Sequence, residues 1–283
     1  DPLLFLEYHR QFTHSLIFIP FGSLLVSLFC WKLFKHGLNF KEVYLFCFLG
    51  YATHGLLDAC TTYGTLLLWP FSDTRFAWNN ISIIDPLLTL PMLTFVILSI
   101  TRKTNFFSRV AVIWVVLYLT VGLIQRERAI EAGYEIASSR AHQPTRLEAK
   151  PSFGNILLWK IVYEQENFFY VDAVRVGITP RVYEGTKTEK LDLDKHFPWL
   201  EIGSQQRRDI KRFHWFSNNY LGIDQNNENK IIDIRYSMLP DEIDALWGIE
   251  LSETASREEH VKWITSREMS AKDIEKFWSM LFN

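Results

Sequence analysis

Four long stretches of apolar residues dominate the first part of the chain. They cover residues 15–34, 43–60, 81–100 and 110–124. A helix needs roughly 20 apolar residues to cross a bilayer core of about 30 Å, and the first stretch is long enough. The fourth is shorter but can extend as a helix. Four transmembrane helices are the simplest interpretation, and the alternative is one large buried helical core.

The pattern changes after residue 125. Residues 125–141 predict a charged helix that continues out of the membrane, and Pro144 and Pro151 mark a linker behind it. Two β-branched and aromatic runs then flank Gln165, Glu166 and Asn167, which predicts a hairpin, and residues 204–221 and 271–282 predict helices. The expected fold class is therefore an α-helical integral membrane domain, residues 1–144, followed by a small soluble α+β domain, residues 145–283.

The charged residues support this division. Of 62 Asp, Glu, Lys and Arg residues, 14 lie in residues 1–124 and 48 in the remaining 159 positions. The net charge is close to +2 in the first part, with 8 basic and 6 acidic residues, and −4 in the second, with 22 and 26. No basic stripe of the kind used by nucleic-acid-binding proteins is present, so no direct nucleic-acid partner is expected.

Basic residues in the short loops indicate an orientation. Between the first and second helices, and between the third and fourth, lie Lys32, Lys35, Lys41, Arg102, Lys103 and Arg109. The positive-inside rule places both loops in the cytoplasm, and then the N-terminal segment, the 61–80 loop and the C-terminal domain lie outside. Arg126 and Arg128 argue the other way. The first apolar run does not follow a basic region with a cleavage site, so it is not expected to be a signal peptide.

Ionisable residues at membrane depth are costly and often functional, which draws attention to His54 and Asp58. They lie four residues apart, so a helix presents both side chains on one face. Imidazole and carboxylate ligands at this spacing suit zinc or another divalent transition metal. A buried histidine–aspartate hydrogen bond that fixes the helix is an equally good interpretation of the spacing.

His9 and His14 precede the first apolar run and are five residues apart. In a regular helix they would point about 140° apart, so both could bind one ion only if the helix starts between them. The alternative is a pair of interfacial histidines. The predicted topology brings His9, His14, His54 and Asp58 to one membrane face, where they could complete a metal site.

Arg75 and Asp85 are expected on the same side. Arg75 could clamp a phosphate or carboxylate, or it could be an anchor at headgroup level beside Trp69 and Trp78. Asp85 could orient a ligand histidine or accept a proton, or it could be the N-cap before Pro86. The other histidines are expected to be surface or core residues: His142, His196, His214 and His260.

Several sequence motifs occur together in the order typical of one family. They are His9-Arg10-x-x-Thr13-His14-Ser15, Thr53-His54-x-x-x-Asp58-x-x-Thr61-x-Tyr63-Gly64, Trp69-Pro70-Phe71-Ser72, Arg75-Phe76 and Ile84-Asp85-Pro86. This pattern resembles the membrane-bound metal-dependent hydrolase family of the YdjM type, also described as LexA-binding, inner-membrane-associated hydrolases. The resemblance covers the membrane half closely, and Lys150-Pro151 to Trp159 extends it as in longer bacterial members.

The resemblance implies a multi-pass protein of the bacterial inner membrane that is distantly similar to zinc-dependent phospholipase C. By analogy, His9, His14, His54 and Asp58 would bind the metal, most simply Zn²⁺, with Mn²⁺ or Fe²⁺ as alternatives. The family pattern includes a further apolar segment and an Asp-containing stretch before the first histidine motif.

The leading hypothesis is a membrane-embedded hydrolase that cleaves a phosphoester of a lipid or lipid-linked substrate with a metal-activated water. Arg75, with Arg10 as a helper, would neutralise phosphate charge, and Asp85 would assist proton transfer. The rival is a non-catalytic inner-membrane protein with a structural His/Asp cluster and a partner-binding soluble domain. A transporter is a third possibility, but the chain lacks paired, broken half-helices.

Overall fold

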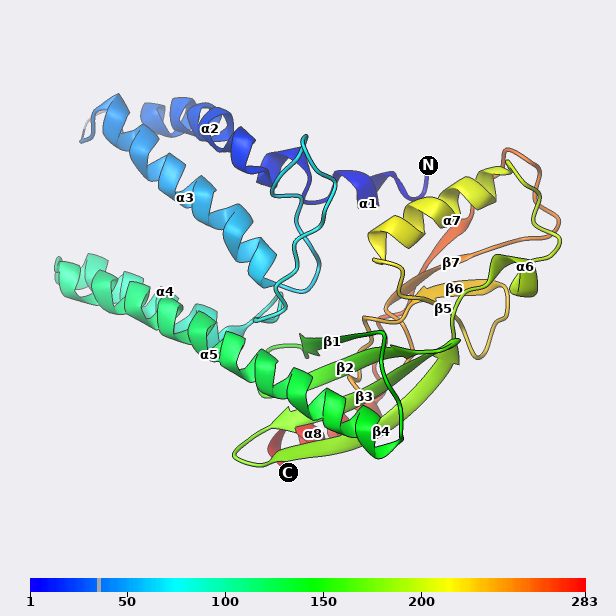
Figure 1. The fold of residues 1–283 in the computed structure, drawn as a ribbon. Helices are drawn as coiled ribbons and strands as arrows, with labels where there is room; N and C mark the ends of the chain where they lie inside the picture. Colours follow the sequence, from blue (N-terminus) through cyan, green and yellow to red (C-terminus); the bar gives the residue numbers. More distant parts are fainter. Residues whose placement is uncertain (35–36) are drawn as a thin grey trace.

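The computed structural model describes residues 1–34 and 37–283, and Figure 1 shows its fold. Two helical hairpins extend to one side of a C-terminal part built from two β-sheets and shorter helices. A membrane helical domain followed by an α+β part is therefore confirmed as the general architecture. The boundary near residue 145 stays a prediction, and Lys35 of the first basic loop lies outside the described residues.

The N-terminal half contains seven helical elements among the described residues. They are α1 (Leu4–Tyr8), η1 (Phe12–His14), η2 (Leu16–Phe18), α2 (Ile19–Phe34), α3 (Phe40–Cys60), α4 (Pro86–Arg102) and α5 (Asn105–Ser139). Helix α2 packs against α3, and α4 packs against α5.

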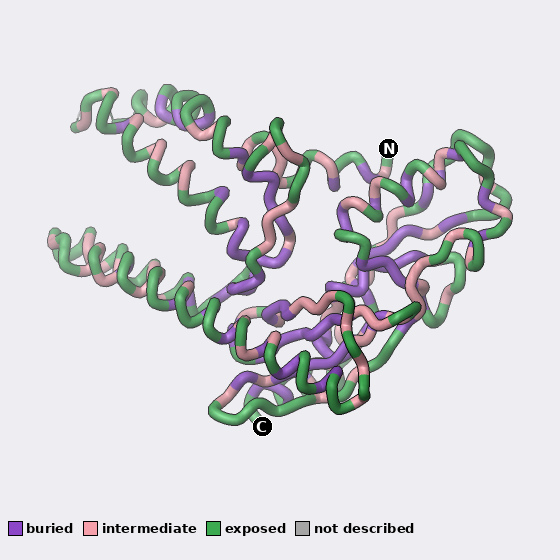
Figure 2. The backbone as a smooth tube through the Cα atoms, in the orientation of Figure 1, coloured by how far each residue is buried: buried purple, intermediate pink, exposed green. Residues whose placement is uncertain are grey.

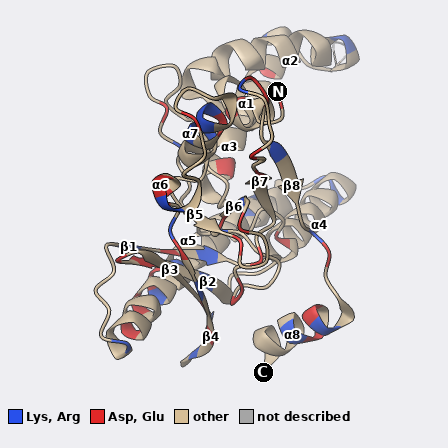
Figure 3. Cartoon of the chain, turned by 90° about the vertical axis from the view of Figure 1, so that its right-hand side faces the viewer, with Lys and Arg blue, Asp and Glu red and all other residues tan. Residues whose placement is uncertain are grey.

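Three segments are long and apolar enough to cross a membrane: Leu16–Phe34, Phe40–Cys60 and Asn105–Ser139. Helix α4 is also apolar, but it has only 17 residues. Exposed positions predominate along these helices, whereas buried positions concentrate in the C-terminal strands (Figure 2). So much exposed apolar surface is typical of a lipid-facing region and not of a soluble core. Charged residues are correspondingly sparse on α2, α3 and α4 (Figure 3).

Local capping residues fix where these helices begin. Asn39 and Glu42 form a capping box at the start of α3. The third apolar stretch was expected to be helical from residue 81, but α4 begins at Pro86 because Asp85 accepts hydrogen bonds from the free backbone N–H groups of Leu87 and Leu88. Helix α5 has 35 residues and leaves the apolar region without a break, which confirms the predicted charged continuation.

The C-terminal part contains two antiparallel four-stranded sheets. The first is a meander of β1 (Arg146–Pro151), β2 (Leu158–Gln165), β3 (Phe168–Val176) and β4 (Pro180–Glu189). The second consists of β5 (Leu221–Ile223), β6 (Lys230–Asp233), β7 (Trp247–Glu250) and β8 (Lys262–Thr265). The predicted hairpin is confirmed as β2–β3, which turns through a left-handed Glu166 with φ of 53°.

Three helices complete this part: α6 (Leu193–His196), α7 (Gln205–Phe216) and α8 (Ala271–Phe282). Helix α8 confirms the predicted range, 271–282, and has Ser270 as its N-cap, but α7 ends at Phe216, earlier than the predicted residue 221. Asn218 and Asn219 adopt left-handed conformations with φ of 50° and 62°, which a helix does not continue through. The second half of α5 packs on the first sheet, where Ala129 and Ala137 are fully buried.

The first residues of the chain dock on the C-terminal part. Leu3 and Leu6 are buried in the same core as Phe213 of α7. Arg212 of α7 forms ion pairs with Asp1 and Glu7 of the N-terminal segment, and Figure 1 shows α1 beside α7. The segment that leads into the histidine motifs is therefore held by α7, which lies far from it in the sequence.

Candidate metal centre

The two N-terminal histidines do not share a regular helix. Helix α1 ends at Tyr8, Arg10 adopts a left-handed conformation with φ of 56°, and the chain resumes as the short helix η1 that contains His14. His9 and His14 therefore point to different neighbours. His14 lies beside the end of α3, and His9 packs edge-on against Tyr63 with ring centroids 4.7 Å apart.

The structure brings together His14, His54 and Asp58. Their ligand atoms lie within 4.8 Å of one another. Nε2 of His14 is 3.0 Å and Nε2 of His54 is 3.6 Å from Oδ2 of Asp58. The side chains of His14 and Asp58 are 15% and 20% exposed, while that of His54 is 57% exposed, so the cluster is reachable from one side.

These separations fit a tetrahedral metal. Ligand bonds of about 2.0–2.1 Å in tetrahedral geometry put neighbouring ligand atoms about 3.4 Å apart. The two observed nitrogen–oxygen distances, 3.0 and 3.6 Å, bracket that value. Two imidazoles and one carboxylate are a donor set used in catalytic zinc sites, which keep a further position for water. The residues present therefore fit a divalent metal.

Contacts around the cluster hold His14 in place. Nδ1 of His14 is 2.9 Å from the hydroxyl of Thr13, and the carbonyl oxygen of Thr13 accepts a hydrogen bond of 2.8 Å from Tyr51 on α3. With its proton on Nδ1, His14 donates to Thr13 and leaves Nε2 free for a metal. Gly55 lets η1 approach α3 closely, since a β-carbon there would lie 2.7 Å from the carbonyl oxygen of His14.

Arg10, expected to help neutralise phosphate charge, contacts Asp58 and Thr61 at the end of α3. Its Nε lies 3.4 Å from Oδ2 of Asp58, and its Nη1 donates to the backbone carbonyl of Asp58 at 3.2 Å and to the hydroxyl of Thr61 at 2.7 Å. Arg10 thus ties the N-terminal segment to the end of α3 and partly neutralises the Asp58 carboxylate. The sequence offered no signal for this contact beyond the presence of both residues in the motifs.

His9 is not within the compact group of three, although it lies nearby. Burial lowers the pKa of His9 below its usual value, and the positive charges of Arg10 and Arg75 lower it further. The imidazole is therefore neutral at neutral pH, as a metal ligand must be. Its role as a fourth ligand stays a prediction.

Asp85 occupies the capping position that was considered as its alternative role. It is 3% exposed, and Oδ1 accepts from the backbone N–H groups of Leu87 and Leu88 at 3.1 and 3.3 Å. The hydroxyl of Tyr118 on α5 lies 2.8 Å from both carboxylate oxygens and donates to them. The first two contacts cap α4 and the third joins it to α5, and a catalytic role for Asp85 stays a prediction.

Arg75, like His9, contacts the ring of Tyr63. Tyr63, Trp215 and Phe216 surround its guanidinium with centroids 5.2–5.7 Å from Cζ. Trp215 and Phe216 belong to α7, so the C-terminal part covers the loop that carries the motifs. Tyr236 of the C-terminal part also contacts this loop, since its hydroxyl donates a hydrogen bond to the carbonyl oxygen of Thr62.

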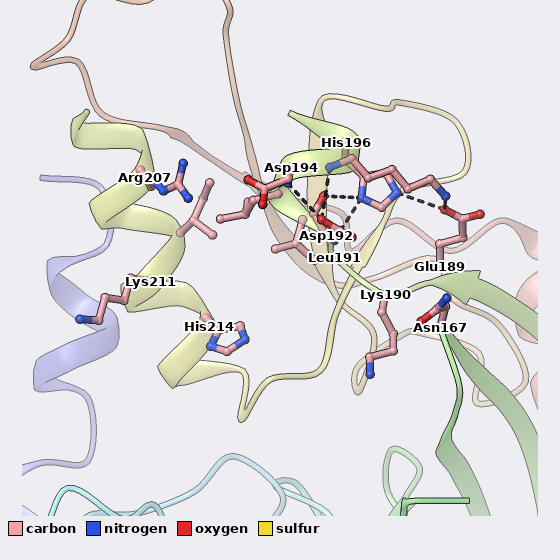
Figure 4. A pocket seen from close by; sticks show the side chains of 13 residues that line it. Asn167, Glu189, Lys190, Leu191, Asp192, Asp194, His196, Arg207, Lys211 and His214 are labelled. Carbon is pink, nitrogen blue, oxygen red and sulfur yellow. Dashed lines mark hydrogen bonds and ion pairs between the residues drawn. The ribbon is translucent and has the colours of Figure 1, made fainter. Parts of the chain in front are cut away.

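Three of the four histidines in the C-terminal part, His142, His196 and His260, contact polar side chains within that part. His142 contacts the Tyr163 hydroxyl, His260 contacts Asp209, and Nε2 of His196 is 3.1 Å from a Glu189 oxygen. His196 and His214 also line a cavity of about 700 Å³ between α6 and α7, drawn in Figure 4. None of the residues that line this cavity belongs to the His14, His54 and Asp58 cluster.

Comparison with known proteins finds a family match for the first part of the chain. Residues 1–129 match the YdjM inner membrane protein family. The YdjM resemblance deduced from the motifs is thus confirmed for this region, which contains the whole cluster. A curated relative, the inner membrane protein YbcI of Escherichia coli (strain K12), is 39% identical over 79 residues, which are 26% of this chain and 44% of YbcI.

The chain therefore covers less than half of that relative's length. No solved structure shows a significant match. The family and the relative are both described as inner membrane proteins, which supports the inner membrane as the location of this protein. Neither description names a reaction.

Proposed function

We propose that the protein is a metal-dependent hydrolase of the inner membrane that cleaves a phosphoester in a lipid or lipid-linked substrate. The observation that supports this is the convergence of His14, His54 and Asp58 at distances that fit one divalent metal, most simply zinc. When bound, such a metal supplies Lewis acidity and an activated water near neutral pH. His14, His54 and Asp58 would hold it, with His9 as a fourth candidate.

The position of the cluster favours a substrate at headgroup level. It is formed where α3 ends at Cys60 and where the short helices η1 and η2 lead into α2, at the end of the hairpin that faces the C-terminal part (Figure 1). We further propose that α4 is a fourth membrane-spanning helix. The basic residues expected at the opposite hairpin ends support a periplasmic position for the cluster and the C-terminal part.

The rival function also has a specific observation in its favour. Arg10 and His14 both contact Oδ2 of Asp58, so the carboxylate has partners without any metal. In that case the cluster would only fasten η1 to α3 in a non-catalytic membrane protein, and the C-terminal part would recruit a partner. The two functions differ in what the cluster binds.

Metal analysis separates them. The full chain is purified beside His54→Ala, which removes a largely exposed ligand, Asp58→Asn, which keeps the carboxylate's shape, and His214→Ala, an exposed control on α7. The proposal predicts about one zinc, manganese or iron per chain in wild type and His214→Ala, and loss of the metal in both cluster variants. Phospholipids and polyprenyl phosphates are then screened for metal-dependent hydrolysis.

A metal-free wild-type protein, even after reconstitution with each ion, would refute the hydrolase. The structural rival predicts this result, together with a lower melting temperature for Asp58→Asn and little change for His54→Ala.

A further inference from the structure

The guanidinium of Arg75 is buried without a counter-ion. Its Nη2 donates to the carbonyl oxygen of Gly64 at 3.0 Å, but Nε and Nη1 are buried and have no hydrogen-bond partner within residues 1–34 and 37–283. Among the described residues, no carboxylate lies within ion-pairing distance of Arg75. A buried charge normally has a partner because removal from water is costly, so this group calls for an explanation.

The surroundings hold Arg75 in place without neutralising it. Gly64 has φ of 91°, and a β-carbon there would lie 3.1 Å from Cβ and 3.3 Å from Nε of Arg75. Three aromatic rings enclose the guanidinium from both parts of the chain. Burial lowers the pKa of Arg75 to about 10, which still leaves it charged at neutral pH.

Arg75 lines a cavity of about 340 Å³ between the 61–80 loop and the C-terminal part. The other cations that line it already have anionic partners. Lys150 lies 3.0 Å from Glu148, and Arg235 pairs with Asp233 at 2.7 Å. Arg75 is therefore the lining cation, among the described residues, whose charge stays unbalanced.

We propose that this cavity binds a phosphate group, with the unpaired N–H groups of Arg75 as its principal donors. An arginine guanidinium matches the charge and geometry of phosphate oxygens. The cavity lies beside the loop that connects the membrane helices α3 and α4, which is the level of lipid headgroups. The C-terminal part contributes Trp215, Phe216 and Lys150 to its wall, so both parts of the chain would be required for binding.

If the proposed hydrolase function holds, this is the phosphate subsite of the substrate. Tyr63 connects the two places, since its ring contacts His9 on one side and lies 5.4 and 5.7 Å from the guanidiniums of Arg10 and Arg75. That assignment rests on the proposed function. Phosphate binding itself does not, because it requires neither a metal nor turnover.

The test uses the full chain in detergent, stripped of metal with a chelator and titrated with inorganic phosphate. Calorimetry gives the dissociation constant, and the melting temperature reports stabilisation by the bound anion. Wild type is expected to bind phosphate and melt at a higher temperature with it. Arg75→Gln should weaken binding by about 10- to 100-fold, the usual effect of losing charged hydrogen bonds, and lose the thermal shift.

Two controls make the result specific. Arg267→Gln removes an exposed arginine on the C-terminal part and should leave binding unchanged. Arg75→Gln without phosphate should melt at the wild-type temperature or above it, because an unbalanced buried charge is removed. Trp215→Leu should weaken phosphate binding, since it alters the wall supplied by α7.

Dihexanoyl phosphatidic acid identifies the source of the phosphate. Tighter binding of this lipid than of inorganic phosphate, again dependent on Arg75, indicates a headgroup, and equal or weaker binding indicates a free phosphate compound. The proposal would be overturned if wild type and Arg75→Gln bound phosphate equally, or if neither bound it. A large loss of stability in phosphate-free Arg75→Gln would overturn it as well. Metal-free His54→Ala should still bind phosphate. Phosphate binding can therefore be established or refuted independently of the hydrolase function.

Discussion

Replacing Asp85 tests whether this motif residue is structural or chemical. In Asp85→Ala, α4 loses the side chain that caps Leu87 and Leu88, which costs about 0.5–2 kcal/mol. The buried hydroxyl of Tyr118 loses its acceptor, which costs about 1–3 kcal/mol more. We therefore expect Asp85→Ala to lower the free energy of unfolding by about 2–4 kcal/mol.

Two further variants separate the contributions. Asp85→Asn keeps an oxygen that can cap the helix and accept from Tyr118, so its stability should stay within about 1 kcal/mol of wild type. Tyr118→Phe keeps the cap and removes only the link to α5, so it should fall between the other two. Equilibrium unfolding in mixed micelles, followed by tryptophan fluorescence and circular dichroism, gives the three values.

Hydrolysis or metal content is then measured on Asp85→Asn, the variant expected to keep its fold. A fully stable Asp85→Ala would refute the structural argument. An Asp85→Asn protein that is stable but inactive would show that the carboxylate has a chemical role as well, as the motif resemblance suggests.

Two other substitutions test the close approach of η1 to α3 and the burial of Lys160. Gly55→Ala should lower the free energy of unfolding by about 1–3 kcal/mol and lower metal occupancy, because its β-carbon would lie 2.7 Å from the carbonyl oxygen of His14. The control Gly50→Ala, on the same helix, has open space around its β-carbon and should be neutral or stabilising. Equal effects of the two substitutions would contradict this account. Burial lowers the pKa of Lys160 to about 7. Between about pH 7 and 10 the unfolded chain therefore binds a proton that the native state has released, and the free energy of unfolding should rise by up to about 1.4 kcal/mol per pH unit. Lys160→Met should remove that rise in denaturation curves, exposed Lys211→Met should retain it, and a slope unchanged by Lys160→Met would disprove the assignment.

The features that local sequence patterns determine were predicted well. Apolar length identified three helices that are long enough to cross a membrane, and the i, i+4 spacing placed His54 and Asp58 on one face of α3. The β2–β3 hairpin follows from its β-branched and aromatic runs and the polar turn between them. Even so, the end of α7 was misplaced, because two left-handed asparagines stop the helix before the hydrophobic pattern does.

Contacts between distant segments could not be predicted. The hydroxyl of Tyr118 reaches Asp85 across 33 positions, and Trp215 and Phe216 cover Arg75 across about 140. No local periodicity records such pairs, because each partner satisfies its own helix or loop pattern without the other. The sequence consequently supplied the chemical groups of the site, whereas the tertiary structure determined which of them meet.

The docking of residues 1–8 on α7 has a consequence for the order in which the protein is assembled. Synthesis proceeds from the N-terminus, so Leu3 and Leu6 emerge long before the core that buries them, which includes Phe213 and Trp247. The contacts of Leu3 and Leu6, which precede the turn with His9, Arg10 and His14, therefore cannot form until these later residues have been made. Folding of α7 and β7 and the final arrangement of the segment that leads into the cluster are consequently coupled in time.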